Sequence, residues 1–175
     1  SLARWEEAGN LAVFMFPLPA NVEAIVPPPD LVLTDASGKI VRDTRAERIG
    51  AKREMGAAAA VLAQSDPLFS SLLESYSKAV EDPTNELVHL FEIKEALATH
   101  FGGEAQLSSI LQISRTRISE FGGICNHSVL SQGRHRGKSI VSLRWASESE
   151  LALARAVAKE FIVTYLKHET HRRNG

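Results

Sequence analysis

The sequence predicts a mainly α-helical bundle with a small N-terminal antiparallel β element. Beyond residue 43, apolar residues recur every three or four positions, which is the period of a helix with one buried face. Two Asp-Pro pairs, at Asp66 and Asp82, each offer an N-cap followed by proline at the first helical position. Upstream, two short β-type runs flank an Asp-Ala-Ser-Gly turn that begins at Asp35.

The first part of the chain differs from the rest. Leu11–Phe16 is a short apolar run, a proline-rich connector follows it, and residues 30–42 are typical of a hairpin. Because isolated hairpins are marginal in water, we expect this one to pack on the helices. The expected division is therefore a β-hairpin or flap appendage at residues 1–43 and a helical bundle domain at residues 44–175.

Residues with known capping preferences mark the helix ends in the bundle domain. Gly102-Gly103 should stop the central helix, and Ser147-Glu-Ser-Glu150 has the pattern of a capping box. Helices are expected at Thr44–Gln64, from Asp66 to about Val80, from Asp82 to about Phe101, at Glu104–Leu111, at Arg115–Ile124 and from Ser147 onward.

Composition limits the classes of function. With 44% hydrophobic and 23% charged residues the chain is of the ordinary globular type, and its net charge of -1 gives no general attraction to nucleic acid or membranes. Leu11–Phe16 is too short to span a bilayer. The single cysteine, Cys125, excludes an internal disulfide framework and a Cys-rich zinc site. We expect a cytoplasmic protein with no metal or other cofactor and no membrane partner.

The segment between Phe121 and Ser147 contains no Asp or Glu. In a chain of nearly balanced charge, such a segment is where an anion would bind. Gly133 and Gly137 would let the backbone approach a phosphate closely. The alternative is a solvated loop whose arginines pair with carboxylates on neighbouring helices. Its positive or titratable side chains are those of His127, Arg134, His135, Arg136, Lys138 and Arg144.

Arg134 and His135 form the pair with the most suggestive chemistry. An imidazole can take the proton of a ribose 2′-hydroxyl or return one to the leaving oxygen, while a guanidinium stabilises the charge that develops on phosphorus. Together the two side chains could cleave RNA without a metal ion.

Five segments between residues 84 and 168 share a pattern with known proteins: Asn85-Glu-Leu-Val-His-Leu-Phe-Glu-Ile, Phe101-Gly-Gly-Glu, Arg117-Ile-Ser-Glu-Phe, Cys125-Asn-His and Gly133-Arg-His-Arg-Gly. They resemble a widespread set of uncharacterised prokaryotic proteins that are similar to the HEPN (higher eukaryotes and prokaryotes nucleotide-binding) superfamily. The resemblance covers about residues 84–168, roughly half of the chain.

The resemblance implies a helical bundle that binds RNA or cleaves it without metal, in prokaryotic defence or a toxin–antitoxin system, and commonly as a homodimer. Asn126 then matches the polar position of the family motif and His135 its terminal histidine. Cys125 stands where the family has arginine, so Arg134 would have to supply that charge. Arg134 and His135 are the expected catalytic residues, with anion binding expected from Asn126, His127, Arg136 and Lys138.

A second prediction concerns residues 105–121, which resemble a helix-turn-helix unit. Ser114 is a good N-cap for its second helix, and Arg115 and Arg117 would contact bases or phosphates of duplex DNA. Gln112 occupies the turn position where glycine is usual. A third alternative is a non-catalytic interaction domain whose loop docks a protein partner.

Overall fold

The computed structural model describes residues 30–174, so Leu11–Phe16 and the proline-rich connector lie outside the described residues. The prediction of a mainly α-helical chain with a small antiparallel β element is confirmed. Two compact units divide between Val61 and Leu62. None of the helices in the described range combines the length and the apolarity that a bilayer crossing needs.

The first unit contains the predicted hairpin. Strands β1 (Val32–Thr34) and β2 (Ile40–Asp43) are antiparallel, with a register irregularity after Leu33. In the turn, one carboxylate oxygen of Asp35 accepts hydrogen bonds from two backbone N–H groups and from the Ser37 hydroxyl, and these bonds lower the pKa of Asp35. Gly38 takes the left-handed conformation that the turn requires, with φ of +83°.

Within the first unit, the strands of this hairpin are exposed. Val32, Ile40 and Val41 are 53%, 58% and 68% exposed. The hairpin is instead held at its base, where helix α1 (Thr44–Ser65) begins. There the Thr44 hydroxyl accepts a hydrogen bond from the N–H of Leu31 at 2.7 Å.

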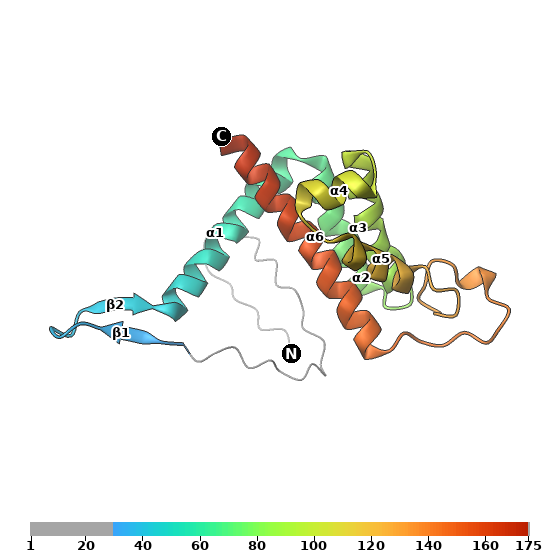
Figure 1. Ribbon diagram of the computed structural model, residues 1–175, viewed down its shortest axis with the longest axis horizontal. Coiled ribbons are helices and arrows are strands. Elements are labelled where there is room, and N and C mark those ends of the chain that lie inside the picture. The colour runs from blue at the N-terminus through green and yellow to red at the C-terminus, as the bar shows by residue number, and fades with distance from the viewer. Residues whose placement is uncertain (1–29, 175) are drawn as a thin grey trace. The chain divides into compact units, whose positions relative to one another are not determined.

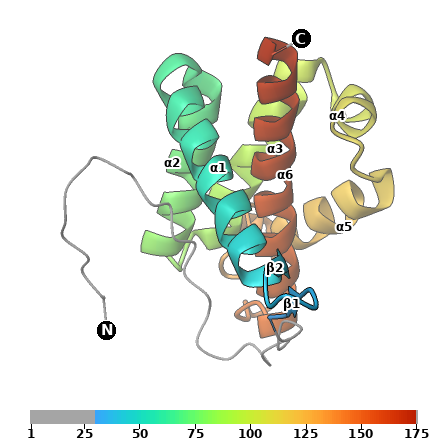
Figure 2. The ribbon, with the colours of Figure 1, turned by 90° about the vertical axis from the view of Figure 1, so that its left-hand side faces the viewer.

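In the second unit, two helices form the centre. Figure 2 shows α3 (Glu86–Phe101) and α6 (Glu148–Asn174) in the middle, with α2 (Pro67–Glu81) on one side. The shorter helices α4 (Glu104–Leu111) and α5 (Arg115–Cys125) lie on the other side. A long connection that contains one 3-10 turn joins α5 to α6 at the end where α6 begins (Figure 1).

Three predicted helix ends are confirmed. Asp66 caps α2 by accepting a hydrogen bond from the N–H of Phe69, and its other carboxylate oxygen accepts one from the Tyr165 hydroxyl of α6 at 2.9 Å. Gly102 ends α3 with φ of +81°. Ser147 and Glu150 form the capping box of α6, each accepting a hydrogen bond from the backbone N–H of the other.

The predicted start of α3 at Asp82 is wrong by a few residues. Asp82 ends α2, and its carboxylate accepts hydrogen bonds from the Thr84 hydroxyl and the Asn85 side-chain amide. These bonds hold the pKa of Asp82 at about 2. Because the carboxylate is engaged within the turn, Asn85 takes the N-cap position and the helix begins at Glu86.

Helix α3 is buried along most of its length, as expected for a central helix. Its apolar residues Leu87, Leu90, Phe91, Ile93 and Leu97 are at most 4% exposed. Phe91 stacks against Phe121 of α5, which in turn packs edge-on against Phe161 of α6. Two charged residues of α3, Glu86 and Lys94, are also buried, at 4% and 7% exposure.

Candidate nucleic-acid interfaces

The connection between α5 and α6 is held by its own polar contacts. Arg144 and the strand-like pair Val129 and Ser131 exchange two backbone hydrogen bonds of 2.8 and 2.9 Å. Gln132 is buried, donates to the carbonyl of Pro83 and accepts from the N–H of Ala146. The acid-free segment is therefore fastened to the α2–α3 turn and to the start of α6.

Gly133 serves this packing directly. A Cβ atom placed on it would lie 2.7 Å from the carbonyl oxygen of His127 and 3.1 Å from that of Leu130. The next residue, Arg134, donates its backbone N–H to the Cys125 carbonyl at 2.9 Å. Gly137 meets nothing within 4 Å. Lack of space for a side chain thus explains Gly133 without a phosphate, whereas the surroundings of Gly137 require no glycine.

Arg134 is paired with a carboxylate of a neighbouring helix. Its guanidinium lies 2.8 Å from a carboxylate oxygen of Glu95 and stacks over the ring of Phe91, 4.7 Å from the ring centroid. Both partners belong to α3. This contact is the one that the solvated-loop alternative predicted, and an anion at Arg134 would have to displace Glu95.

The Arg136 side chain also has partners, and these are uncharged oxygen atoms. Its guanidinium donates to the side-chain oxygen of Asn85 at 2.7 Å and to the carbonyls of Ser131 and Thr84. These contacts fasten the connection to the N-terminus of α3. Arg136 therefore acts here as a structural clamp.

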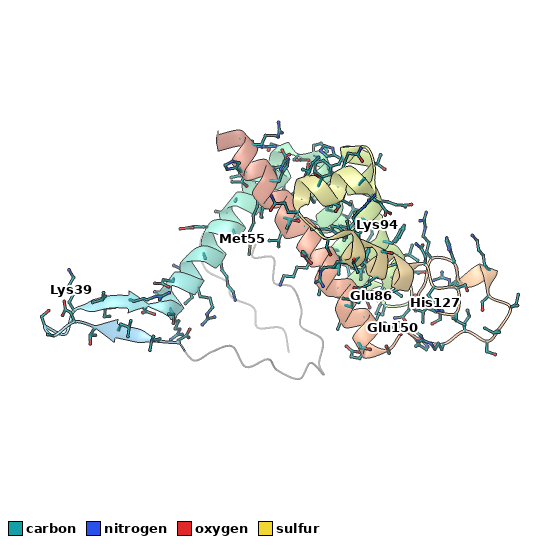
Figure 3. All side chains as sticks on the ribbon, in the orientation of Figure 1. Lys39, Met55, Glu86, Lys94, His127 and Glu150 are labelled. Atoms are coloured by element: carbon teal, nitrogen blue, oxygen red, sulfur yellow. The ribbon has the colours of Figure 1, made fainter. Side chains whose placement is uncertain are left out.

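The remaining candidates of the segment are less engaged. The half-buried ring of His135 and the exposed ammonium of Lys138 have no hydrogen bond or ion pair within residues 30–174. His127 is exposed, and its Nδ1 accepts a hydrogen bond from the N–H of Val129. Figure 3 shows His127 in the connection, apart from Lys94, which lies beside α4 and α5.

Of the predicted residues, Asn126 and Arg134 are brought to the same part of the unit. Asn126 lines a pocket together with Phe91 and Glu95, the two residues that Arg134 contacts. The sequence prediction did not include Lys94 or Glu104 of this pocket. The sequence signal for this pocket was the lysine within the apolar run of α3, because a charged side chain on a buried helix needs a partner of opposite charge.

The predicted helix-turn-helix segment forms two helices joined by a turn of three residues. Gln112 is left-handed, with φ of 54°, and the Ser108 hydroxyl donates to the carbonyl of Ile113. Ser114 caps α5 by accepting a hydrogen bond from the N–H of Arg117. Five apolar residues of this segment are at most 5% exposed, whereas Ile110 is 40% exposed. The five are Leu107, Leu111, Ile113, Ile118 and Phe121.

The two arginines at the start of α5 differ in their surroundings. Arg115 is exposed and has no partner among the described residues. Arg117 forms an ion pair with Glu160 of α6, and both side chains are more than a third exposed. At the other end of α5, burial raises the pKa of the Cys125 thiol to about 12. That thiol is therefore a packing residue.

Comparisons with protein-family models, with curated proteins and with solved structures found no match to this chain.

Replacing Gly133 tests the packing of the connection. Gly133→Ala should lower the free energy of unfolding by about 1–3 kcal/mol, because the added methyl group has to displace two carbonyl groups. Gly137→Ala is the matched control and should change it by less than about 0.5 kcal/mol. Urea denaturation of both variants gives the two values, and equal effects would contradict the close approach at Gly133.

The capping box of α6 predicts a loss of stability in acid. The guanidinium of Arg144 and the Ser147 N–H hold the pKa of Glu150 at about 2, against an ordinary value of 4.5. A lowered pKa stabilises the fold above the ordinary value, and this contribution is lost as pH falls from 4.5 towards about 2. Urea denaturation over this interval should show a steeper loss of stability for the native chain than for Glu150→Gln. Parallel curves would contradict the prediction.

Proposed function

We propose that the helical unit binds duplex DNA through the helix-turn-helix formed by α4 and α5. The observation that carries this proposal is the turn between the helices. A left-handed residue, Gln112, is followed by the buried Ile113 and by the N-cap Ser114. This arrangement joins the two helices through three residues and leaves the start of the second helix open to solvent.

The left-handed backbone conformation of Gln112 is energetically unfavourable, and the fold keeps it nevertheless. A residue other than glycine in the left-handed region loses about 1–2 kcal/mol. The buried Leu111 and Ile113 on either side hold Gln112 in place, at 5% and 2% exposure. The chain therefore keeps the turn of a helix-turn-helix unit with a residue that is poorly suited to it.

The exposed side of α5 offers suitable groups for a major groove. Arg115, Thr116 and Ser119 are exposed, and they follow the N-terminus of the helix, where the backbone dipole favours a phosphate. The ion pair of Arg117 and Glu160 is more than a third exposed on both sides, so it contributes little and a DNA phosphate could replace the carboxylate. Arg115 and Arg117 are the two cationic side chains of α5, so each should contribute measurably to DNA binding.

Substitution of the α5 arginines tests this proposal. Arg115→Ala and Arg117→Ala should each weaken binding to duplex DNA and reduce the slope of log affinity against log salt by about 0.9, the value for one lost phosphate contact. Glu160→Gln should strengthen binding, because it frees Arg117. Fluorescence anisotropy with a labelled duplex over a salt series measures all three effects.

Arg134→Ala is the matched control, because Arg134 and Arg117 are both paired with a glutamate and are 39% and 38% exposed. It should leave duplex binding unchanged. An absence of salt-dependent duplex binding, or an equal loss in the control, would overturn the proposal.

A second candidate function is that of a HEPN-like RNA-binding or RNA-cleaving domain that acts as a homodimer. It is supported by the ring of His135, which follows Arg134 in the chain and has no partner among residues 30–174. The Glu95 partner of Arg134 is 49% exposed, so an RNA phosphate could replace it at small cost. In this function Arg134 would hold a phosphate and His135 would transfer the proton.

RNA assays separate this candidate from the first. Arg134→Ala should reduce RNA binding and His135→Ala should abolish cleavage, whereas Glu95→Gln should strengthen binding because it frees Arg134. Filter binding and gel analysis of a labelled RNA measure the effects, with Arg115→Ala as a control that should behave like the native chain. RNA binding and cleavage that are the same in the native chain and in the three test variants would rule the candidate out.

A further inference from the structure

A pocket of about 560 Å³ lies where α3, the α3–α4 junction and the end of α5 meet. Its volume is in the range of sites for small molecules. Its apolar and glycine residues are Phe91, Ala98, Gly102 and Gly103. Its polar residues are Lys94, Glu95, Thr99, Glu104 and Asn126.

The buried cation is Lys94, whose side chain is 8% exposed. Its ammonium lies 4.3 Å from the centroid of the Phe91 ring and is paired with the carboxylate of Glu104, the first residue of α4. A buried ammonium needs an anion beside it, since taking it out of water costs several kcal/mol. Lys94 therefore requires negative charge at this place.

Glu104 is a replaceable partner for this cation. Its side chain is 55% exposed, so it returns to water easily when it is released. A negative charge in the first turn of a helix is also stabilised by the helix dipole, so Glu104 keeps a favourable position without Lys94. An oxyanion from solution could therefore replace this carboxylate at small cost.

A second cationic group lies close to Lys94. The guanidinium of Arg134 lies over the same Phe91 ring, 4.7 Å from its centroid, so the two cationic groups are within about 9 Å of each other. Arg134 is likewise neutralised by an exposed carboxylate, that of Glu95. The four groups sum to zero charge, so an anion that takes the place of one carboxylate restores the balance at the two cationic groups.

Asn126 adds a separate observation. Its side-chain oxygen is buried and accepts no hydrogen bond within the part of the chain that the structure describes. A buried acceptor without a donor costs about 1–3 kcal/mol. Asn126 lines the pocket, so a rotation of its amide would bring this oxygen to a hydroxyl or N–H group of a bound molecule.

We propose that this pocket binds a small molecule through a carboxylate or phosphate group, which takes the place of the Glu104 carboxylate at the ammonium of Lys94. A donor group of the same molecule satisfies Asn126. This site does not include the α5 arginines, so it is independent of the proposed DNA binding. It shares Glu95 with the RNA candidate, and Lys94 and Glu104, which that candidate does not use, distinguish the two.

The experiment is a titration of the native chain, followed by two-dimensional NMR of the backbone amides. Inorganic phosphate and succinate are the two probes, each compared with sodium chloride at equal ionic strength. Saturable shifts should appear at Gly102, Gly103 and Asn126, and the stronger probe identifies the favoured oxyanion. Shifts that do not saturate, or that sodium chloride reproduces, would overturn the proposal.

Two variants with opposite expected effects make the test sharper. Lys94→Met should abolish saturable binding, whereas Glu104→Gln should tighten it by about two- to fivefold, the equivalent of one exposed ion pair. Lys167→Met, at an exposed lysine of α6, is the matched control and should bind like the native chain. If Lys94→Met does not fold, Glu104→Gln and the native titration still decide. Unchanged or weaker binding in Glu104→Gln would overturn the exchange at Lys94.

Discussion

The burial of α3 is the constraint on which the rest of the second unit depends. A helix surrounded by other helices can keep an ionised side chain only if a partner of opposite charge accompanies it. Glu86 and Lys94 are such side chains, and they determine what neighbouring elements must supply. Arg155 of α6 meets Glu86 with two guanidinium nitrogens, and Glu104 of α4 meets Lys94. The ion pairs of Glu86 and Lys94 thus help to position α6 and α4 around α3.

The two ion pairs differ in how exposed their partners are, and this difference distinguishes a structural pair from a candidate binding site. Arg155 is 28% exposed and holds both oxygens of the Glu86 carboxylate, which is 5% exposed. Removing Arg155 would therefore leave a buried unpaired charge and cost about 3–5 kcal/mol. Lys94 instead depends on the largely exposed Glu104 beside an open pocket. The first pair stabilises the core, and the second can exchange its anion.

Much of the fold could be predicted because its signals are local. The cap at Asp66, the stop at Gly102 and the capping box at Ser147 each depend on neighbours within a few residues. The start of α3 was predicted at the wrong residue, because the Asp82 carboxylate can either cap a helix or accept hydrogen bonds within the turn. Sequence spacing does not decide between the two. The pairing of Arg134 with Glu95 and of Lys94 with Glu104 depends on tertiary contacts, so the sequence showed the charges without their partners. The resemblance to HEPN domains stays a prediction.

The buried thiol of Cys125 has a practical consequence for the study of this chain. It is the single cysteine of the sequence, and with a pKa of about 12 it is almost fully protonated at neutral pH. A thiol reagent can reach it only when the end of α5 separates from its neighbours. The rate of alkylation in the native state therefore reports how often this helix opens, with no label introduced into the protein.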